Sequence, residues 1–313
     1  MLSRVAAHLY WMSRYLERAE NMARILDVTQ SLAMLDRSAD SGGAMTPIVI
    51  TEAQAEFAAT NLPATYENVV AFLAWDRQHP SSIRNCIEST RENARAVRGS
   101  ITSEMWENIN DTWIAFQEKS RSINPLMTGN EFFEWVKERS HLFRGITFAT
   151  ARRDQPYHFV RLGTFIERAD NTARILDVKY FILLPKATDV GSDIDLHQWG
   201  QILRSVSAHR AYRWFYRNSG YKAWLVAEFL ILREEMPRSL LFSYSWICTA
   251  LAGLAQLHGK RYDIHAQAEE TRDGLRKGRM EDIFQSGLRE YLQHFIQSNN
   301  QLSRDIATTY NFP

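Results

Sequence analysis

The sequence "YLERAENMARILDV" spans Tyr15 to Val28, and "FIERADNTARILDV" spans Phe165 to Val178. The two stretches lie 150 positions apart, and ten of their fourteen residues are identical. In both, apolar side chains recur at the three- and four-residue spacing of a helix with one apolar face. We interpret the pair as one helix that occurs twice in a duplicated chain.

A second pair of segments extends the repeat. "VVAFLAWDRQHPSSI" (69–83) resembles "VAEFLILREEMPRSL" (226–240), now 157 positions apart, and the two share a Phe-Leu pair, a proline and a serine. The change of offset requires a seven-residue insertion, which we place in "LPKATDVGSDID" (184–195). We therefore predict two repeat units, residues 1–150 and 151–313, that together make one compact module.

Helical periodicity continues through nearly the whole chain, and alternating patterns typical of strands are absent. We expect one helix after Pro80 and one after Pro237, each opened by the proline, with breaks at 38–47, 124–129 and 185–192. Further helices are expected near 51–60, 65–77, 102–120, 130–150, 195–217, 221–235, 261–272 and 281–308. The predicted fold is all-α, a tandemly duplicated helical bundle whose two pseudo-symmetric halves pack together.

The composition favours a soluble protein of the cytoplasm. The 313 residues carry 37 basic and 36 acidic side chains, so no net field attracts nucleic acid or an anionic membrane. Only two cysteines occur, and no apolar run reaches the length of a membrane span or has the layout of a leader peptide. We expect no nucleic-acid partner and no membrane.

Each repeated helix has a polar stripe opposite its apolar stripe. Three interpretations stay open: a solvated surface, a structural network in which arginines of one copy pair with carboxylates of the other, and a polar ligand cavity shared by both copies. A stranded charge in such a network would cost about 3–5 kcal/mol. The candidate residues are Glu17, Arg18, Glu20, Asn21, Arg24, Asp27, Glu167, Arg168, Asp170, Asn171, Arg174 and Asp177.

A looser echo, "ESTRENARAVR" (88–98), forms a basic ridge of Arg91, Arg95 and Arg98, followed by Trp106 and Trp113. Arginine and tryptophan are enriched at protein interfaces. The corresponding segment of the second half is apolar, so we expect only the first half to offer this ridge to a partner.

Searches for known catalytic patterns find little. The nine histidines form no HExxH pattern, and no Gly-rich phosphate loop or nucleophile elbow is present. We expect no metal and no cofactor, and catalytic residues cannot be assigned from the sequence.

The repeated E-R-A-[ED]-N-x-A-R-I-L-D motif, "RENARAVRGSITSEMWENIN" (91–110) and "MPRSL" (236–240) together resemble the bacterial alpha-E family. This all-helical family is named for its Glu-Arg motif, and the resemblance covers essentially the whole chain. Its members are usually encoded beside a circularly permuted ATP-grasp protein and often a transglutaminase-like cysteine peptidase. The motif positions that carry over are Glu17, Arg18, Asn21, Arg24, Glu167, Arg168, Asn171 and Arg174.

The resemblance implies a helical accessory protein, or a substrate- or product-binding partner, of an ATP-grasp system that forms amide (peptide) bonds. The alternative is a stand-alone enzyme of amide or peptide metabolism. In that alternative Glu17 and Glu167 act as acid and base, and Arg24 and Arg174 clamp a carboxylate substrate.

Overall fold

The structure is a computed structural model that describes residues 1–35, 43–182, 193–217 and 219–313. Within these ranges the chain is helical and contains no strand, as the sequence predicts. The break expected at 185–192 lies outside the described residues, as does most of the insertion expected at 184–195. Half of the break expected at 38–47, residues 38–42, also lies outside them.

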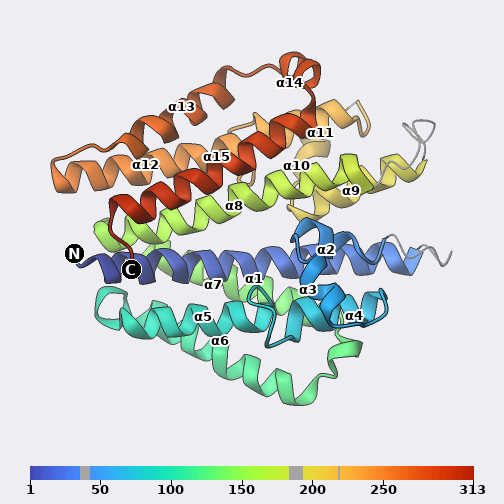
Figure 1. Cartoon of the computed structure of the whole chain (residues 1–313), viewed down its shortest axis with the longest axis horizontal. Coiled ribbons are helices and arrows are strands. Elements are labelled where there is room, and N and C mark those ends of the chain that lie inside the picture. The colour runs from blue at the N-terminus through green and yellow to red at the C-terminus, as the bar shows by residue number, and fades with distance from the viewer. Residues whose placement is uncertain (36–42, 183–192, 218) are drawn as a thin grey trace.

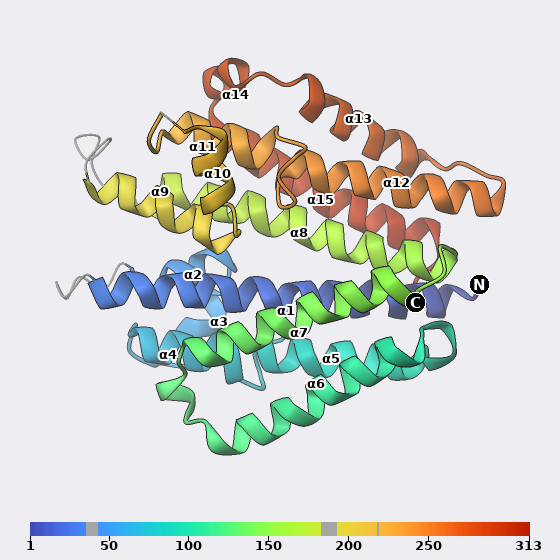
Figure 2. The ribbon, with the colours of Figure 1, turned by 180° about the vertical axis from the view of Figure 1, so that it is seen from behind.

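Two long helices, α1 (Ser3–Leu35) and α8 (Gln155–Ile182), run side by side through the middle of the molecule (Figures 1 and 2). Each carries one copy of the repeated motif. Helices packed beyond α1 are α5 (Ile83–Ala96), α6 (Ser103–Ser122) and α7 (Asn130–Thr150). Helices packed beyond α8 are α12 (Leu240–His258), α13 (Asp263–Lys277) and α15 (Leu288–Thr309).

Shorter helices fill the spaces at the sides of this arrangement. In the first half they are α2 (Thr46–Ile50), α3 (Gln54–Ala59) and α4 (Tyr66–Val70), with a π turn at Ala71–Trp75 and 3-10 turns at Arg98–Ser100 and Pro125–Met127. In the second half they are α9 (Asp193–Ser205), α10 (His209–Phe215), α11 (Ala223–Ile231) and α14 (Met280–Ser286). Helix α2 lies against both α1 and α8.

Two predicted helices are each divided in the structure. The helix expected at 195–217 separates into α9 and α10 at Ser207, which has a φ of 55°. The helix expected at 281–308 separates into α14 and α15 at Gly287, which has a φ of 89°. Left-handed backbone interrupts a right-handed helix, and periodicity alone does not reveal it. Helix α2 was not predicted, because it is only five residues long.

Serines, and not prolines, open α5 and α12. Ser82 precedes α5 and its hydroxyl accepts a hydrogen bond from the Asn85 amide at 3.2 Å. Ser239 precedes α12 and accepts one from the Phe242 amide at 3.0 Å. The helices expected after Pro80 and Pro237 are both present, and each proline lies two residues before the serine N-cap. The two caps occupy the same place in the 157-residue alignment.

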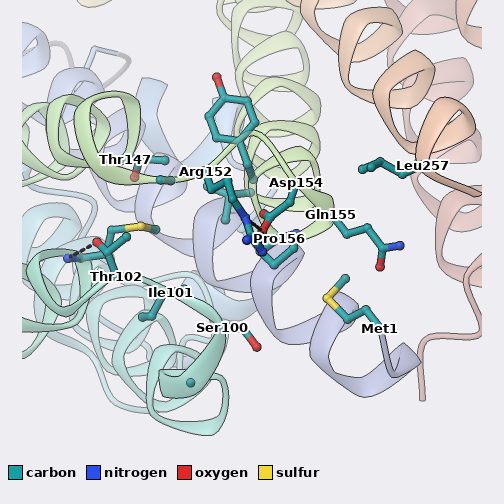
Figure 3. A pocket seen from close by; sticks show the side chains of 15 residues that line it. Met1, Ser100, Ile101, Thr102, Thr147, Arg152, Asp154, Gln155, Pro156 and Leu257 are labelled. Atoms are coloured by element: carbon teal, nitrogen blue, oxygen red, sulfur yellow. Dashed lines mark hydrogen bonds and ion pairs between the residues drawn. The ribbon is translucent and has the colours of Figure 1, made fainter.

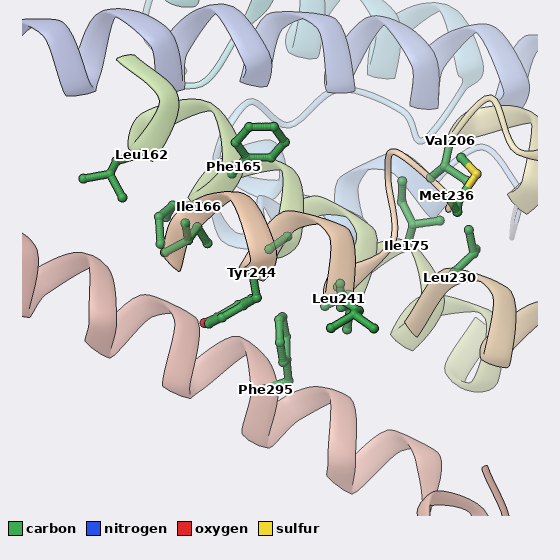
Figure 4. Close-up of a cluster of buried hydrophobic side chains, with 14 of the residues drawn as sticks. Leu162, Phe165, Ile166, Ile175, Val206, Leu230, Met236, Leu241, Tyr244 and Phe295 are labelled. Carbon is green, nitrogen blue, oxygen red and sulfur yellow. The ribbon is translucent and has the colours of Figure 1, made fainter. Parts of the chain in front are cut away.

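The apolar core packs against α1 and α8. One cluster of buried side chains joins α1, α8, α12 and α15, and part of it is shown in Figure 4, where Tyr244 of α12 lies against Phe295 of α15. A second cluster joins α1 to the π turn, α5, α6 and α7. Because both clusters reach α1, its polar stripe is enclosed as well as its apolar one.

One helix among the described residues, α12, is long and apolar enough to cross a membrane by length and composition. In this structure α12 packs against α8 and α13, and more than half of it is buried. Its hydrophobic character is accounted for by its place in the core.

Candidate functional site

The polar stripes of the repeated helices are buried where α1 and α8 meet. Side chains that are at least nine-tenths buried in this region are Glu17, Glu20, Asn21, Arg24, Glu167, Arg168 and Asn171. The interpretation of these stripes as a solvated surface was therefore wrong. A helix that is surrounded by neighbours buries both of its faces, and buried charges must then be paired.

Glutamate and arginine of each motif pair with their counterparts in the other motif. Arg168 of α8 donates from Nε to Glu17 Oε1 at 2.8 Å and from Nη2 to Glu17 Oε2 at 3.0 Å. Arg18 of α1 donates from Nε to Glu167 Oε1 at 2.6 Å and from Nη2 to Glu167 Oε2 at 3.0 Å. In both pairs the arginine uses Nε and Nη2, and the glutamate uses both of its carboxylate oxygens. Pairing at two points neutralises the charge and also fixes the relative orientation of the two side chains.

Three more arginines complete the first acidic cluster, which we define as Glu17, Glu20 and Asn21. Arg144 of α7 contacts both carboxylates, Arg24 donates from Nε to Glu20 at 2.9 Å, and Arg238 donates to Glu20 at 2.5 Å. Arg238 also donates to Asn21 Oδ1 at 3.0 Å and lies 3.4 Å from Glu17. The cluster is therefore closely filled with guanidinium groups.

The second acidic cluster, Glu167, Asp170 and Asn171, has fewer partners. Arg14 donates to Glu167 at 2.8 Å, in addition to the two bonds from Arg18. Asp170 accepts from Arg174, four residues further along α8, at 2.6 Å. Arg174 is shared with the exposed carboxylate of Glu52, 2.6 Å away in the turn after α2.

Burial raises the pKa values of the buried carboxylates, and pairing with arginine lowers them. Burial raises the pKa of Glu17 and Glu20, but the surrounding arginines outweigh it and hold the pKa of Glu17 below, and that of Glu20 well below, the usual range. The same balance, with Arg18 and Arg14, lowers the pKa of Glu167 to about 2. For Asp170 burial outweighs the attraction of Arg174, and its pKa is raised. The two clusters thus differ in how completely their charge is compensated.

A cavity of about 230 Å³ opens beside the second cluster, between α1, α2 and α8. We call it the α1–α2–α8 cavity. Residues of both motifs line it, together with the end of α2 and the loop before α5. The lining side chains are Arg18, Asn21, Met22, Ile25, Ile50, Thr51, Glu52, Ser81, Glu167, Asp170, Asn171 and Arg174. The structure thus combines two of the interpretations: a paired network on one side and a polar cavity on the other.

The last acidic positions of the motifs lie apart from both clusters. Asp27 forms an ion pair with the buried Lys137 of α7 at 2.8 Å. Asp177 is half-buried, and burial raises its pKa despite the opposing charge of Arg289 and a hydrogen bond from Gln293. Neither residue lines the cavity, so we assign them to helix packing.

The basic ridge predicted at Arg91, Arg95 and Arg98 lies on one side of the first half. Arg91 is partly buried and donates to Asn110 at 3.1 Å, whereas Arg95 and Arg98 are exposed. Glu92 pairs with both Arg91 and Arg95, so part of the ridge's charge is neutralised. Arg98 belongs to the 3-10 turn after α5 and stacks on Trp106, with 5.1 Å between the guanidinium carbon and the ring centre. The ridge as a partner surface stays a prediction.

Sequence reasoning missed three arginines of the network: Arg14, Arg144 and Arg238. Arg14 directly precedes the quoted stretch, one turn before Arg18, and Arg144 belongs to a helix without a repeated pattern. Arg238 had a signal, because the "MPRSL" segment aligns with "HPSSI" and places this arginine opposite Ser81. An arginine in only one of two similar segments marks a place where the halves differ.

A larger pocket, about 590 Å³, lies elsewhere, where α7 ends and α8 begins (Figure 3). Its charged side chains, Arg152 and Asp154, pair with each other at 2.8 Å. No residue of the two repeated motifs lines it. We find no group of side chains there that is arranged for catalysis, and the motif-lined cavity is the better candidate despite its smaller volume.

Comparison with known proteins identifies the family. A family model named Alpha-E, described as a predicted alpha-helical domain with a conserved ER motif, matches residues 1–310. The chain therefore belongs to the Alpha-E family. It is also 22% identical to an uncharacterized protein of Mycobacterium bovis and 21–22% identical to uncharacterized proteins of two Mycobacterium tuberculosis strains, over 97% of this chain. The chain spans about a third (36%) of the length of these relatives. No solved structure matches the chain significantly.

Proposed function

We propose that this protein is a cytoplasmic helical partner of an amide-bond-forming ATP-grasp enzyme and that its α1–α2–α8 cavity holds a substrate or product of that system. The observation that carries the proposal is the cavity itself, which collects Arg18, Glu167 and Asn171 from both copies of the family's motif. The genomic neighbours of the family, an ATP-grasp protein and a transglutaminase-like peptidase, supply the reaction class. ATP chemistry then belongs to the partner, because this sequence has no phosphate loop.

We also propose that the bundle arose by duplication of a four-helix unit. The order of packing neighbours supports this: α1 contacts α5 and α7 while α6 contacts both of those, and α8, α12, α13 and α15 repeat the arrangement. The reciprocal Glu17–Arg168 and Glu167–Arg18 pairs support it as well. In this view the cavity is a site formed at the meeting of two repeats.

The alternative of a stand-alone enzyme has less support. It needs Glu17 and Glu167 to exchange protons near neutral pH, but the arginines around them lower both pKa values, that of Glu167 to about 2. A general acid or base works best with a pKa near the working pH. A carboxylate that stays ionised and is held at two points by an arginine is better suited to fixing structure than to proton transfer.

The partner contact is proposed for the basic ridge. Arg95 and Arg98 are exposed, Arg91 is partly so, and Trp106 provides an aromatic surface beneath Arg91 and Arg98. The mycobacterial relatives have most of their length outside the match, so in them this module is part of a longer chain. That arrangement is consistent with a module that works beside another protein unit.

Co-expression with the neighbouring ATP-grasp protein, followed by pull-down at two salt concentrations, tests the contact. We expect a complex that weakens as salt rises above physiological strength, because exposed charges are screened within about 8 Å there. Reversal of Arg91, Arg95 and Arg98 to Glu should abolish the complex while circular dichroism stays unchanged. The matched control reverses three exposed arginines on other helices, Arg121, Arg210 and Arg304. If no complex forms at micromolar protein in either salt, the partner proposal is wrong and the stand-alone enzyme becomes the first candidate.

A further inference from the structure

Arg238 and Ser81 occupy matching positions in the two halves, 157 residues apart. Both positions lie in the loop that contacts the motif arginine of the same half. Arg18 donates from Nη1 to Ser81 Oγ at 3.2 Å, and Arg168 donates from Nη1 to the Pro237 carbonyl at 3.4 Å. In the second half the side chain of Arg238 extends from this loop into the first acidic cluster. In the first half Ser81 is too short to extend into the second cluster, and the α1–α2–α8 cavity lies there.

The two acidic clusters differ by one arginine, and Glu20 also lies 3.3 Å from His141 Nε2. Glu17 and Glu20 receive guanidinium groups from Arg168, Arg144, Arg24 and Arg238. Glu167 and Asp170 receive them from Arg18, Arg14 and Arg174. Arg18 and Arg174 are the counterparts of Arg168 and Arg24, and Arg14 takes the part of Arg144. The missing member is the counterpart of Arg238, and the raised pKa of Asp170 beside the strongly lowered pKa of Glu20 agrees with that absence.

The amide of each motif gives a second, independent indication. Asn21 Oδ1 accepts a hydrogen bond from Arg238 at 3.0 Å. The Nδ2 atoms of Asn21 and of its counterpart Asn171 both lack a hydrogen-bond partner among the described residues, so the two amides differ only at Oδ1. Arg238 donates to that of Asn21, whereas Asn171, which is nine-tenths buried, lines the cavity. An amide oxygen is an acceptor, so Asn171 Oδ1 can accept a hydrogen bond from a donor placed in the cavity, as Asn21 Oδ1 does from Arg238.

The size and lining of the cavity fit a short cationic chain. Its volume of about 230 Å³ is below the range of roughly 300–1,000 Å³ that is usual for drug-sized ligands. Met22, Ile25 and Ile50 offer apolar surface for methylene groups, and the carboxylates of Glu167 and Asp170 line the same cavity. The nearby Arg18 and Arg174 oppose a cation but do not exclude one. In the other half, burial and the charges of their counterparts Arg168 and Arg24 lower the pKa of Arg238 to about 9, against the attraction of Glu20 and Glu17.

We propose that the α1–α2–α8 cavity binds the guanidinium group of an arginine-like ligand, in the place that Arg238 fills within the first acidic cluster. Asp170 and Glu167 accept its hydrogen bonds, Asn171 supplies the amide oxygen, and the methylene stem packs on Met22 and Ile25. The inference rests on the proposed function only in treating this cavity as the ligand site. It does not require the ATP-grasp contact.

Calorimetric titration of the full chain with agmatine, a guanidinium on a four-carbon stem, tests the proposal. We expect one binding site, and at least tenfold weaker binding of putrescine, which has an ammonium in place of the planar guanidinium. Ser81→Arg, which places the second half's side chain in the cavity, should weaken agmatine binding at least tenfold. Asp170→Asn should do the same and carries the test if the Ser81 variant does not fold. Ser122→Arg adds the same charge at an exposed position of α6 and should bind agmatine as the unaltered chain does.

Absence of agmatine binding at millimolar concentration, or equal affinity in Asp170→Asn and Ser122→Arg, would overturn the inference. The outcome is separable from that of the pull-down. A complex with the ATP-grasp protein without agmatine binding removes only the guanidinium assignment. Agmatine binding without a complex supports the guanidinium assignment and removes only the partner.

Discussion

Glu17 and Glu167 each find their arginine partner in the other copy of the motif, and not in their own copy. Within one helix, Glu17 and Arg18 are neighbours in sequence and point in different directions, so they do not pair with each other. Across the α1–α8 contact, each glutamate meets the arginine of the other copy through the same two atoms. The side chains are buried, so each charge depends on its partner.

The lowered carboxylate pKa values predict loss of stability in acid. A group with a pKa lowered on folding contributes stability that is present above its unfolded pKa and is lost as the pH falls through its folded pKa. For Glu167 these values are 4.5 and about 2, a contribution of roughly 3 kcal/mol. We expect the free energy of unfolding in urea to be nearly constant from about pH 7 to 5 and to fall between about pH 4.5 and 2.

Asp170 has the opposite effect on stability in acid, because its pKa is raised in the folded state and its protonation therefore stabilises the fold.

Glu167→Gln should reduce the loss of stability in acid, whereas Glu281→Gln, which removes an exposed carboxylate of α14, should leave that loss unchanged. A free energy of unfolding that does not change between pH 5 and 3 would contradict the paired network.

How much of the site was predictable differs from residue to residue. Glu17, Glu167 and the two motif arginines stand out because identical residues recur at one offset. The choice between surface, network and cavity could not be made from the sequence, because a polar stripe looks the same whether water or another helix covers it. Arg144 is 124 residues from Glu20, and only the packing of α7 on α1 brings the two together.

At the scale of elements, a close approach of α1 and α8 holds the network together. Gly163 of α8 faces Ser13 and the Tyr10 carbonyl of α1, and a Cβ at this position would overlap both. A larger residue would push the helix backbones apart in the region where Arg168 and Arg18 reach across. Helix positions were predictable from periodicity, but this contact was not, because a glycine can occur within a helix for reasons other than close packing.

Gly163→Ala should therefore lower the free energy of unfolding by about 1–3 kcal/mol or more, as overpacking does. The matched control is Gly145→Ala in α7, where an added Cβ meets nothing within 4 Å. There alanine should be neutral or stabilising by up to about 1 kcal/mol, because it is the better helix former. Urea unfolding of both variants decides, and equal stability of the two would refute the close approach.

At the scale of the whole molecule, α1 and α8 form a common axis for two sets of packed helices. The all-helical class and most helix positions followed from the sequence, since long amphipathic segments leave few other folds. The difference between the two acidic clusters did not follow from the sequence. One half fills its acidic cluster with Arg238 and the other leaves a cavity beside Ser81, a difference that depends on where a single loop side chain reaches.

Two double-mutant cycles measure whether reciprocal ion pairs hold α1 to α8. One combines Glu17→Gln with Arg168→Gln, the other Glu167→Gln with Arg18→Gln, and the free energy of unfolding is determined in urea. We expect a coupling energy of about 1–3 kcal/mol in each cycle. The exposed pair Glu234–Arg276, 3.1 Å apart, should give at most about 0.5 kcal/mol. Coupling in both motif cycles no larger than that of the exposed pair would contradict the reciprocal network.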